Sequence, residues 1–184
     1  DNGNAGYGTS IVGTVSGTSI SFGTAVVFAS TNCYCNKSVY DSFNNVVVIS
    51  YYDNTDANKG KAVVATVSGT SVSFGTPVTF NATTAYDPMV TFDSINNKLV
   101  FVSAANATTK GVAVVGTVSG TTISFGTPVT FSSGVSIYQR VSFDSTNNSI
   151  VIVYRDAVNS NFGTFVSGTV SGTTISFGTP TVFE

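Results

Sequence analysis

The sequence predicts an all-β protein built from tandem repeats, and three observations support that prediction. The phrase GTVSGTTISFGTPVTF at 116–131 returns in similar form at 13–28, 65–80 and 168–183, so that successive copies begin 51 or 52 residues apart. A fixed period of about fifty residues is typical of propellers and solenoids. The composition is rich in β-branched and aromatic residues, and Gly, Asn and Ser, which favour turns, separate them at short intervals.

One period divides into four expected strands, at 89–93, 98–104, 112–118 and 121–131. The first strand alternates in polarity, and Asn96-Asn97 tolerates the positive φ of a tight hairpin that leads into the second. We expect Ser119-Gly120 to form a two-residue turn between the third strand and the fourth. Four antiparallel strands per period have the size and order of a propeller blade.

Proline indicates that the fourth strand is an edge. Pro77, Pro128 and Pro180 each follow Phe-Gly-Thr, and a proline lacks the backbone donor that a central strand needs. The second strand is the most apolar and should lie between neighbouring sheets. Ile123 and Phe125 share one face of the fourth strand, which favours a packing contact between blades.

These assignments predict one repeat domain of about three and a half blades. Residues 1–28 form a half blade with only the third and fourth strands, and complete blades follow at 29–80, 81–131 and 132–184. A closed ring needs the first and second strands that this half blade lacks. We therefore expect these residues to be part of a longer repeat chain.

Charge and composition argue against several classes of protein. Seven Lys and Arg, scattered singly, offer no basic surface to a nucleic acid, and no apolar run is long enough for a membrane-spanning helix. The absence of histidine removes Ser–His and Cys–His nucleophile pairs and leaves zinc without its usual partner. We predict a non-enzymatic protein with no metal or other cofactor, and its low charge favours an extracellular or virion-surface location.

Repeat geometry predicts which face would bind a ligand. The turns within the hairpins are nearly constant, whereas the loops from the second strand to the third, and from one blade to the next, differ in every copy and emerge on the opposite face. Tyrosine beside amide and charged groups is a common way to bind a sugar, although tyrosine is also a frequent rim residue. The candidate ligand-binding residues on this face are Tyr34, Asp53, Asp56, Tyr86, Asp87, Tyr138, Arg140, Asp156 and Asn159.

Three further groups have competing interpretations. Asp41, Asp93 and Asp144 begin the D-S-x-N-N turns, where an aspartate accepts hydrogen bonds from nearby backbone N–H groups, so we predict a structural role rather than paired catalytic carboxylates. Calcium at Asp53 and Asp56 is a minor alternative, because the segment lacks the spacing of an EF-hand loop.

The only two cysteines, Cys33 and Cys35, form a local disulfide if the protein is exported; two free thiols or half of a metal site are the alternatives.

The segments GTVSGTTISFGTPVTF and FDSTNNSIVIVYRD resemble the propeller-like repeats of large extracellular surface proteins and of tail-fibre-like proteins of phages and other viruses. The resemblance covers essentially the whole chain and implies a structural or receptor-binding part of such an assembly. We expect a display and adhesion module that binds carbohydrate or a cell-surface receptor. The alternatives are a purely structural spacer or decoration protein of a fibre or capsid and, less favoured, a glycoside-acting hydrolase.

Overall fold

The computed structural model describes residues 5–104 and 110–183, with the side chains of Cys35 and Ser133 excepted. All of the regular secondary structure in these ranges is β-strand, and the strands pair antiparallel, as predicted. In chain order they are β1 (Tyr7–Ser10), β2 (Gly13–Ser16), β3 (Ser19–Phe22), β4 (Val26–Asp41), β5 (Val46–Asp53), β6 (Lys59–Ser68), β7 (Ser71–Phe74), β8 (Val78–Thr84), β9 (Tyr86–Asp93), β10 (Lys98–Ala104), β11 (Lys110–Ser119), β12 (Thr122–Phe125), β13 (Val129–Asp144), β14 (Ser149–Asp156), β15 (Phe162–Ser171), β16 (Thr174–Phe177) and β17 (Thr181–Val182).

The strands group into four successive units, which we call half-unit A (7–28), unit B (29–80), unit C (81–131) and unit D (132–183). In unit C, β9 pairs with β10, β10 with β11, and β11 with both β12 and the first part of β13. Units B and D repeat this order of pairing. In half-unit A, β1 pairs with the first part of β4, and β2 pairs with β3.

Two long strands join neighbouring units. β4 and β13 are each 16 residues long; the first part of each closes one unit, and the second part opens the next. The sequence predicted a loop at these two junctions. Between units B and C the same connection is interrupted at Ala85, which separates β8 from β9.

The turns follow from the local sequence. The second asparagine of each D-S-x-N-N turn has positive φ, as expected: Asn45, Asn97 and Asn148. The prediction for the second hairpin was wrong by one residue, because Ser119 pairs with Thr122 and the turn is therefore Gly120-Thr121. Gly120, with φ of 59°, takes the first central position, which in a type II′ turn requires positive φ and so favours glycine.

The core lies between successive units, and the burial expected of the second strand is confirmed, since residues 99–102 of β10 are fully buried. The predicted fourth strand is divided in two, because β12 ends at Phe125, β13 begins at Val129, and Pro128 lies exposed in the gap between them. Pro77 and Pro180 occupy the same gap in units B and D. Ile123 of unit C packs in one cluster with Val64 of unit B. A second cluster joins units C and D, and a smaller one joins half-unit A and unit B.

Glycine makes a close contact between units. A Cβ at Gly126 would collide with the backbone oxygen of Thr173 in the next unit, and Gly75 meets Thr121 in the same way. At Gly178, in the last unit, the nearest atoms to such a Cβ belong to Ser167 at 3.8 Å, an ordinary contact distance. Because the glycine of Phe-Gly-Thr has no side chain, the hairpin of the following unit can pack directly against its backbone.

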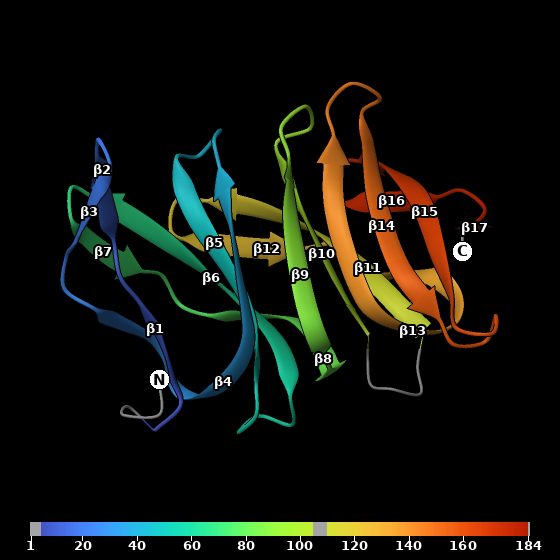
Figure 1. Ribbon diagram of the computed structural model, residues 1–184, viewed down its shortest axis with the longest axis horizontal. Coiled ribbons are helices and arrows are strands. Elements are labelled where there is room, and N and C mark those ends of the chain that lie inside the picture. The colour runs from blue at the N-terminus through green and yellow to red at the C-terminus, as the bar shows by residue number, and fades with distance from the viewer. Residues whose placement is uncertain (1–4, 105–109, 184) are drawn as a thin grey trace.

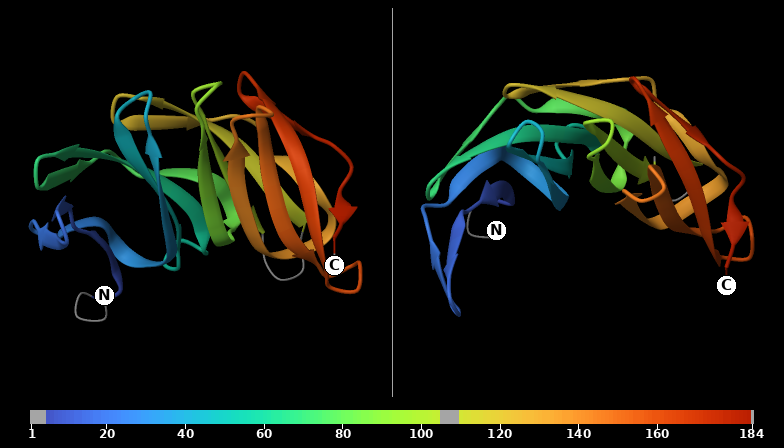
Figure 2. Two further views of the ribbon diagram at one scale, coloured as in Figure 1. Left: turned by 45° about the horizontal axis from the view of Figure 1, so that its top comes forward. Right: turned by 90° about the horizontal axis from the view of Figure 1, so that it is seen from above.

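The units follow an open arc, and the described strands do not close into a ring (Figures 1 and 2). The hairpin β2–β3 and the last strand, β17, lie toward opposite ends of this arc (Figure 2). β9 lines the concave side, where it contacts β4 and β13, while β7, β12 and β16 lie toward the convex side (Figure 2). None of the described residues forms an apolar helix of the length that a bilayer crossing requires.

Candidate binding face

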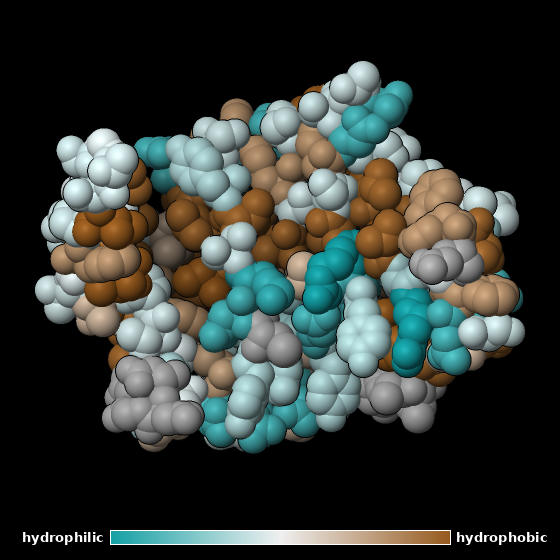
Figure 3. All heavy atoms as spheres, in the orientation of Figure 1, coloured by the Kyte–Doolittle hydropathy of each residue, from teal (hydrophilic) through white to brown (hydrophobic). Residues whose placement is uncertain are grey.

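The two kinds of connection lie at opposite ends of the strands. The three D-S-x-N-N turns, which join β4 to β5, β9 to β10 and β13 to β14, lie at the top of Figure 1, whereas the loops from β5 to β6 and from β14 to β15 lie at the bottom. A band of hydrophilic residues crosses the lower parts of β4, β9 and β13 on the concave side (Figure 3). We call the lower end, with its variable loops, the loop face.

A row of tyrosines crosses the loop face from unit B to unit C. The ring of Tyr34 stacks on that of Tyr52 with centroids 5.4 Å apart, and Tyr52 meets the ring of Tyr86 edge to face at 5.8 Å. Tyr34 and Tyr86 remain 44% and 43% exposed. Both candidates therefore lie in one aromatic array, and Tyr52 links them.

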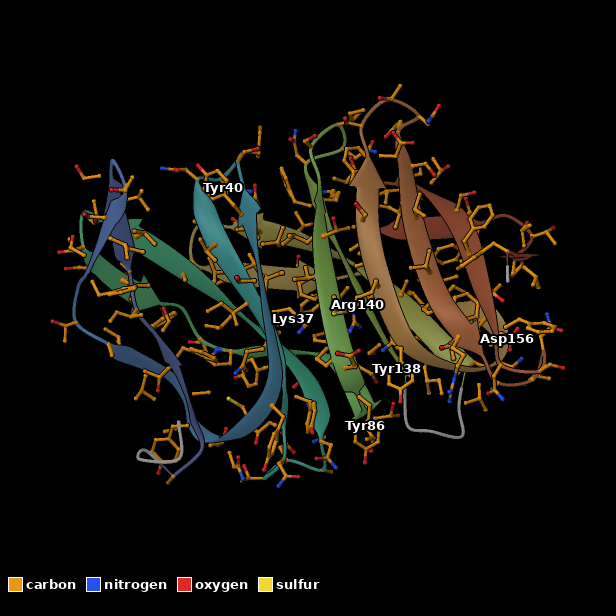
Figure 4. All side chains as sticks on the ribbon, in the orientation of Figure 1. Lys37, Tyr40, Tyr86, Tyr138, Arg140 and Asp156 are labelled. Atoms are coloured by element: carbon orange, nitrogen blue, oxygen red, sulfur yellow. The ribbon has the colours of Figure 1, made fainter. Side chains whose placement is uncertain are left out.

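Tyr138 lies near Tyr86 in Figure 4 but occupies a different position in its unit. Tyr34 pairs with Tyr52, Tyr86 with Ala104 and Ile137 with Arg155, so the residue equivalent to Tyr34 and Tyr86 is Ile137. Each first strand then has a bulge in which two residues oppose one. Tyr138 lies in that bulge with φ of 57°, as Asp87 does in unit C with φ of 45°. Its ring projects outward, 67% exposed, with the Arg155 guanidinium 5.2 Å from the centroid.

Polar contacts join Tyr86 to the next unit. Arg140 Nη1 of β13 donates to Asp87 Oδ2 at 2.6 Å, and the buried Gln139 donates from Nε2 to the carbonyl oxygens of Tyr86 and Asp87, both at 3.0 Å. The bulge that carries Tyr86 and Asp87 is thus held against β13. Asp87 and Arg140 lie together as an ion pair at the edge of the tyrosine row.

Asp53 and Asp56 share one lysine. Lys61 Nζ lies 2.7 Å from Asp53 Oδ2 and 3.1 Å from Asp56 Oδ2, and Lys59 also contacts Asp56 at 2.8 Å. Burial by itself raises the pKa of the Asp53 carboxyl, but hydrogen bonds from Lys61 and Thr55 hold it below its ordinary value. Hydrogen bonds from Lys59 and Lys61 lower the pKa of Asp56. Calcium at these carboxylates would have to displace the Lys61 ammonium.

The last two candidates lie apart from the tyrosine row, nearer the C-terminal end of the arc. Asp156 is buried at the end of β14, where its Oδ1 accepts a hydrogen bond from the backbone N–H of Val158 at 3.1 Å (Figure 4). Asn159 is exposed in the following loop and donates its backbone N–H to the carbonyl oxygen of Asp156. Asn159 is therefore the solvent-exposed member of this pair.

The aspartates of the D-S-x-N-N turns have the structural role that the sequence predicted. Asp93 Oδ1 accepts from the backbone N–H groups of Ile95 and Asn96, and its Oδ2 accepts from the Asn96 side chain. Asp41 and Asp144 make the same three contacts in their own turns.

Cys33 is buried and has no disulfide partner among the described side chains; in its thiol form, burial together with the nearby charge of Asp53 raises its pKa. The side chain of Cys35 lies outside the described residues, so the disulfide stays a prediction.

Four residues of this face escaped the sequence analysis: Tyr52, Lys61, Gln139 and Arg155. Tyr52 and Arg155 lie directly opposite Tyr34 and Ile137 in their hairpins, so cross-strand pairing was the available signal. Gln139 gave no signal, because its partners belong to another unit.

Neither described pocket is lined by a carboxylate. One, of about 350 Å³, lies between half-unit A and unit B, and the other, of about 300 Å³, is lined by Tyr138, Arg155, Asn161 and Phe183, among others. Among the described residues, no group of three or more Cys, Asp or Glu side chains is placed to hold a metal ion. Comparison of the chain with protein-family models, curated proteins and solved structures finds no match.

Proposed function

We propose that this protein is a non-enzymatic display and adhesion module of an extracellular or virion surface, and that it binds carbohydrate or a glycosylated receptor through the loop face. The observation that carries the proposal is the tyrosine row Tyr34–Tyr52–Tyr86, with Tyr138 near one end. Tyrosine rings stack on the C–H faces of sugars, and their hydroxyls hydrogen-bond to sugar hydroxyls. The neighbouring Arg140 and Asp87 supply charged partners.

We also propose that units B, C and D are blades of a β-propeller-type array and that half-unit A is the outer part of another. Support comes from the antiparallel order of each unit, in which three consecutive strands are followed by two short outer segments that both pair with the third, and from the concave position of β9. In such an array the loops that vary between units gather at one end of the strands. A ligand would then contact side chains from two or three units at once.

Hydrolysis is not part of the proposal. Asp53 is bound to Lys61, Asp87 is paired with Arg140, and Asp156 caps a turn. Glycoside hydrolysis needs two carboxyl groups on either side of the scissile bond. These three carboxylates instead stabilise the loops that carry them, and the role that we assign to the face is recognition without a cofactor.

A glycan array probed with the intact protein tests the proposal. We expect selective binding to a subset of glycans, weakened about fivefold or more by Tyr86→Ala or Tyr138→Ala, because a stacked ring contributes about 1 kcal/mol or more to affinity. Tyr40→Ala is the matched control, since Tyr40 is also exposed but lies at the opposite end of the strands (Figure 4). Binding that Tyr40→Ala weakens as much as Tyr86→Ala does, or no binding to any glycan, would overturn the proposal.

A structural role as a spacer or decoration protein in a fibre or capsid is the second candidate. The exposed apolar side chains of half-unit A favour it, because Val15, Ile20 and Phe22 are 70%, 54% and 61% exposed. Apolar groups gathered on one hairpin are typical of a surface that another chain covers. Negative-stain images of the purified protein would show ordered end-to-end assemblies if this role is correct.

A further inference from the structure

Asp53 of unit B and Asp156 of unit D occupy equivalent positions at the ends of β5 and β14. Asp53 pairs across strands with Cys33, and Asp156 pairs with Ser136 in the same register (Figure 4). Both aspartates are buried, with 2% and 5% of their surface exposed. A buried carboxylate is costly unless hydrogen bonds or an opposite charge compensate it, so the partners of these two groups are the useful comparison.

The Asp53 carboxylate has three side-chain and backbone partners. Lys61 Nζ lies 2.7 Å from its Oδ2. Thr55 donates to its Oδ1 from the backbone N–H at 3.0 Å and from the hydroxyl at 2.7 Å. Lys61 reaches the carboxylate from the third strand of the unit, where it pairs with Tyr51. One positive charge and two hydrogen bonds therefore compensate the burial of Asp53.

The Asp156 carboxylate has only one of these partners, the backbone N–H of Val158 at 3.1 Å. Val158 takes the place of the threonine, so the hydroxyl is lost, and Thr164 takes the place of the lysine in the third strand. None of the ion pairs among the described residues involves Asp156. The adjacent Arg155 faces the other side of β14, where its guanidinium lies over the Tyr138 ring.

Two buried hydroxyls beside this carboxylate also lack partners. Ser136 Oγ and Tyr154 Oη have no hydrogen-bond partner in the part of the chain that the structure describes. Ser136 lies directly opposite Asp156 and Tyr154 lies two residues before it, so their side chains leave the sheet on the same face as the carboxylate. Thr164, opposite Tyr154, adds a third buried hydroxyl to this face. The face is turned toward unit C, where the Tyr154 ring packs against Phe131.

The Tyr154 hydroxyl is an oxygen donor in its neutral form. Burial, with a smaller contribution from the charge of Asp156, raises the pKa of Tyr154 to about 12. The carboxylate therefore supplies the only negative charge among the four oxygen-bearing side chains on this face. Unit B has a second carboxylate, Asp56, beside its lysine, but Asn159 stands at the equivalent position of unit D.

We propose that unit D binds a hard monovalent cation, Na⁺ or K⁺, at Asp156, in the place that the Lys61 ammonium takes in unit B. Hard cations prefer oxygen ligands, and the carboxylate and the unpartnered hydroxyls of Ser136 and Tyr154 supply them. The charge of one carboxylate balances a monovalent ion, whereas a divalent ion would leave excess positive charge in a buried place. The ion joins β13 to β14 and has a structural role that is independent of binding at the loop face.

Unfolding equilibria at constant ionic strength test the proposal. Urea denaturation of the intact protein is measured as NaCl or KCl replaces tetramethylammonium chloride, whose cation is too large for a buried position. We expect the folding equilibrium constant to rise about tenfold when Na⁺ or K⁺ reaches about ten times its dissociation constant, because the ion binds only the folded state. The salt with the larger effect identifies the ion. Water alone, or a proton on Asp156, would leave stability unchanged by either salt and would overturn the proposal.

Variants of unit D locate the ion. Asp156→Asn removes the charge, and Thr164→Lys supplies the ammonium group that unit B has, so we expect neither variant to respond to Na⁺ or K⁺. Asp144→Asn is the matched control, because it removes a carboxylate from the other end of the same hairpin. Its response to the salts should stay within about twofold of that of the unchanged protein, since the two sites do not share partners.

Sodium NMR detects the bound ion without relying on the stability of a variant. Exchange with a site on the slowly tumbling protein broadens the sodium resonance. We expect the unchanged protein and Asp144→Asn to broaden it, Asp156→Asn to broaden it much less, and added KCl to reverse the effect by competition. Equal broadening by Asp156→Asn and the unchanged protein would overturn the assignment to Asp156. A larger stabilisation by CaCl₂ than by either monovalent salt at the same ionic strength would overturn the choice of a monovalent ion.

Discussion

Half-unit A and unit C carry nearly the same phrase, at 13–28 and 116–131, but they bury it to very different extents. Ile20 is 54% exposed, whereas its counterpart Ile123 is 5% exposed. The hairpins themselves agree, since β2–β3 and β11–β12 have the same register and both turns have a glycine with positive φ. The difference arises because β12 contacts β6 and β8 of the preceding unit, whereas no unit precedes β3 in the described part of the chain.

This comparison separates what the phrase itself encodes from what its neighbours provide. Turn chemistry and strand pairing are local and recur wherever the phrase occurs. Burial of the Ile-Ser-Phe face depends on the adjacent unit, as expected when stability is a sum of units and nearest-neighbour interfaces. The same substitution should therefore have different effects in different copies.

The largest difference should come from truncating the equivalent isoleucines. Ile123→Ala removes buried methyl groups from the cluster between units B and C and should lower the free energy of unfolding by about 2–5 kcal/mol. Ile20→Ala should cost less than about 1 kcal/mol, because that side chain is already largely exposed. Urea denaturation of both variants measures the contrast. Equal losses would mean that half-unit A is covered in solution.

A smaller difference should separate two glycines of the Phe-Gly-Thr motif. Gly126→Ala pushes a Cβ against the Thr173 backbone oxygen and should cost about 1–3 kcal/mol as units C and D move apart. Gly178→Ala meets only ordinary contacts and should change stability by less than about 0.5 kcal/mol. Thermal unfolding of the pair measures this contrast. A large loss at Gly178 would show that something packs against the last unit.

The smallest effect concerns the Asp53–Lys61 ion pair, which among the described residues has no counterpart in units C and D. Lys61→Met in unit B leaves the buried Asp53 carboxylate without its ammonium partner, and we expect a loss of about 1–2 kcal/mol at neutral pH, measured by urea denaturation. Lys59→Met is the control, since Lys59 contacts only the more exposed Asp56 and its loss should matter less. A larger loss for Lys59→Met would contradict this account of the cluster.

The pH dependence of the same pair has a definite sign. The folded-state pKa of Asp53 lies below the ordinary value of 3.8, so its stabilisation is complete above that pH and is lost as the pH falls through the folded pKa. Burial by itself lowers the pKa of Lys61, but the hydrogen bonds that its ammonium donates to Asp53 and Asp56 hold it above the ordinary 10.5. Its contribution is complete below pH 10.5 and is lost as the pH rises through the folded pKa. The stability of Lys61→Met should lack the loss at alkaline pH and should gain less from the Asp53 carboxylate above pH 3.8, because only the hydrogen bonds from Thr55 remain.

Local signals predicted the strands well. β10 runs from Lys98 to Ala104 as expected, because a continuous apolar run ends at a turn on one side and at polar residues on the other. The continuous strand through residues 129–144 was missed, because its polar middle has the composition of a loop. That segment stays extended because Val135 pairs with Lys110 of β11 and Ser136 pairs with Asp156 of β14.

The loop face was predictable only in part. Tyr34 and Tyr86 recur at equivalent positions, and they lie in one row. Tyr138 is offset because a bulge changes which side of the strand each residue faces, and sequence spacing alone does not reveal a bulge. The contacts of Arg140 with Asp87 and of Gln139 with the Tyr86 carbonyl cross between units, so they depend on how the units pack.

The two unbroken strands also determine how the molecule would carry tension. Force applied at the ends would pass from half-unit A to unit B along β4, and from unit C to unit D along β13, each a single hydrogen-bonded strand. Between units B and C the chain passes through Ala85, and the backbone pairing divides there into two separate sheets. Under load we expect units B and C to separate first. Half-unit A would stay joined to unit B by β4, and unit C to unit D by β13.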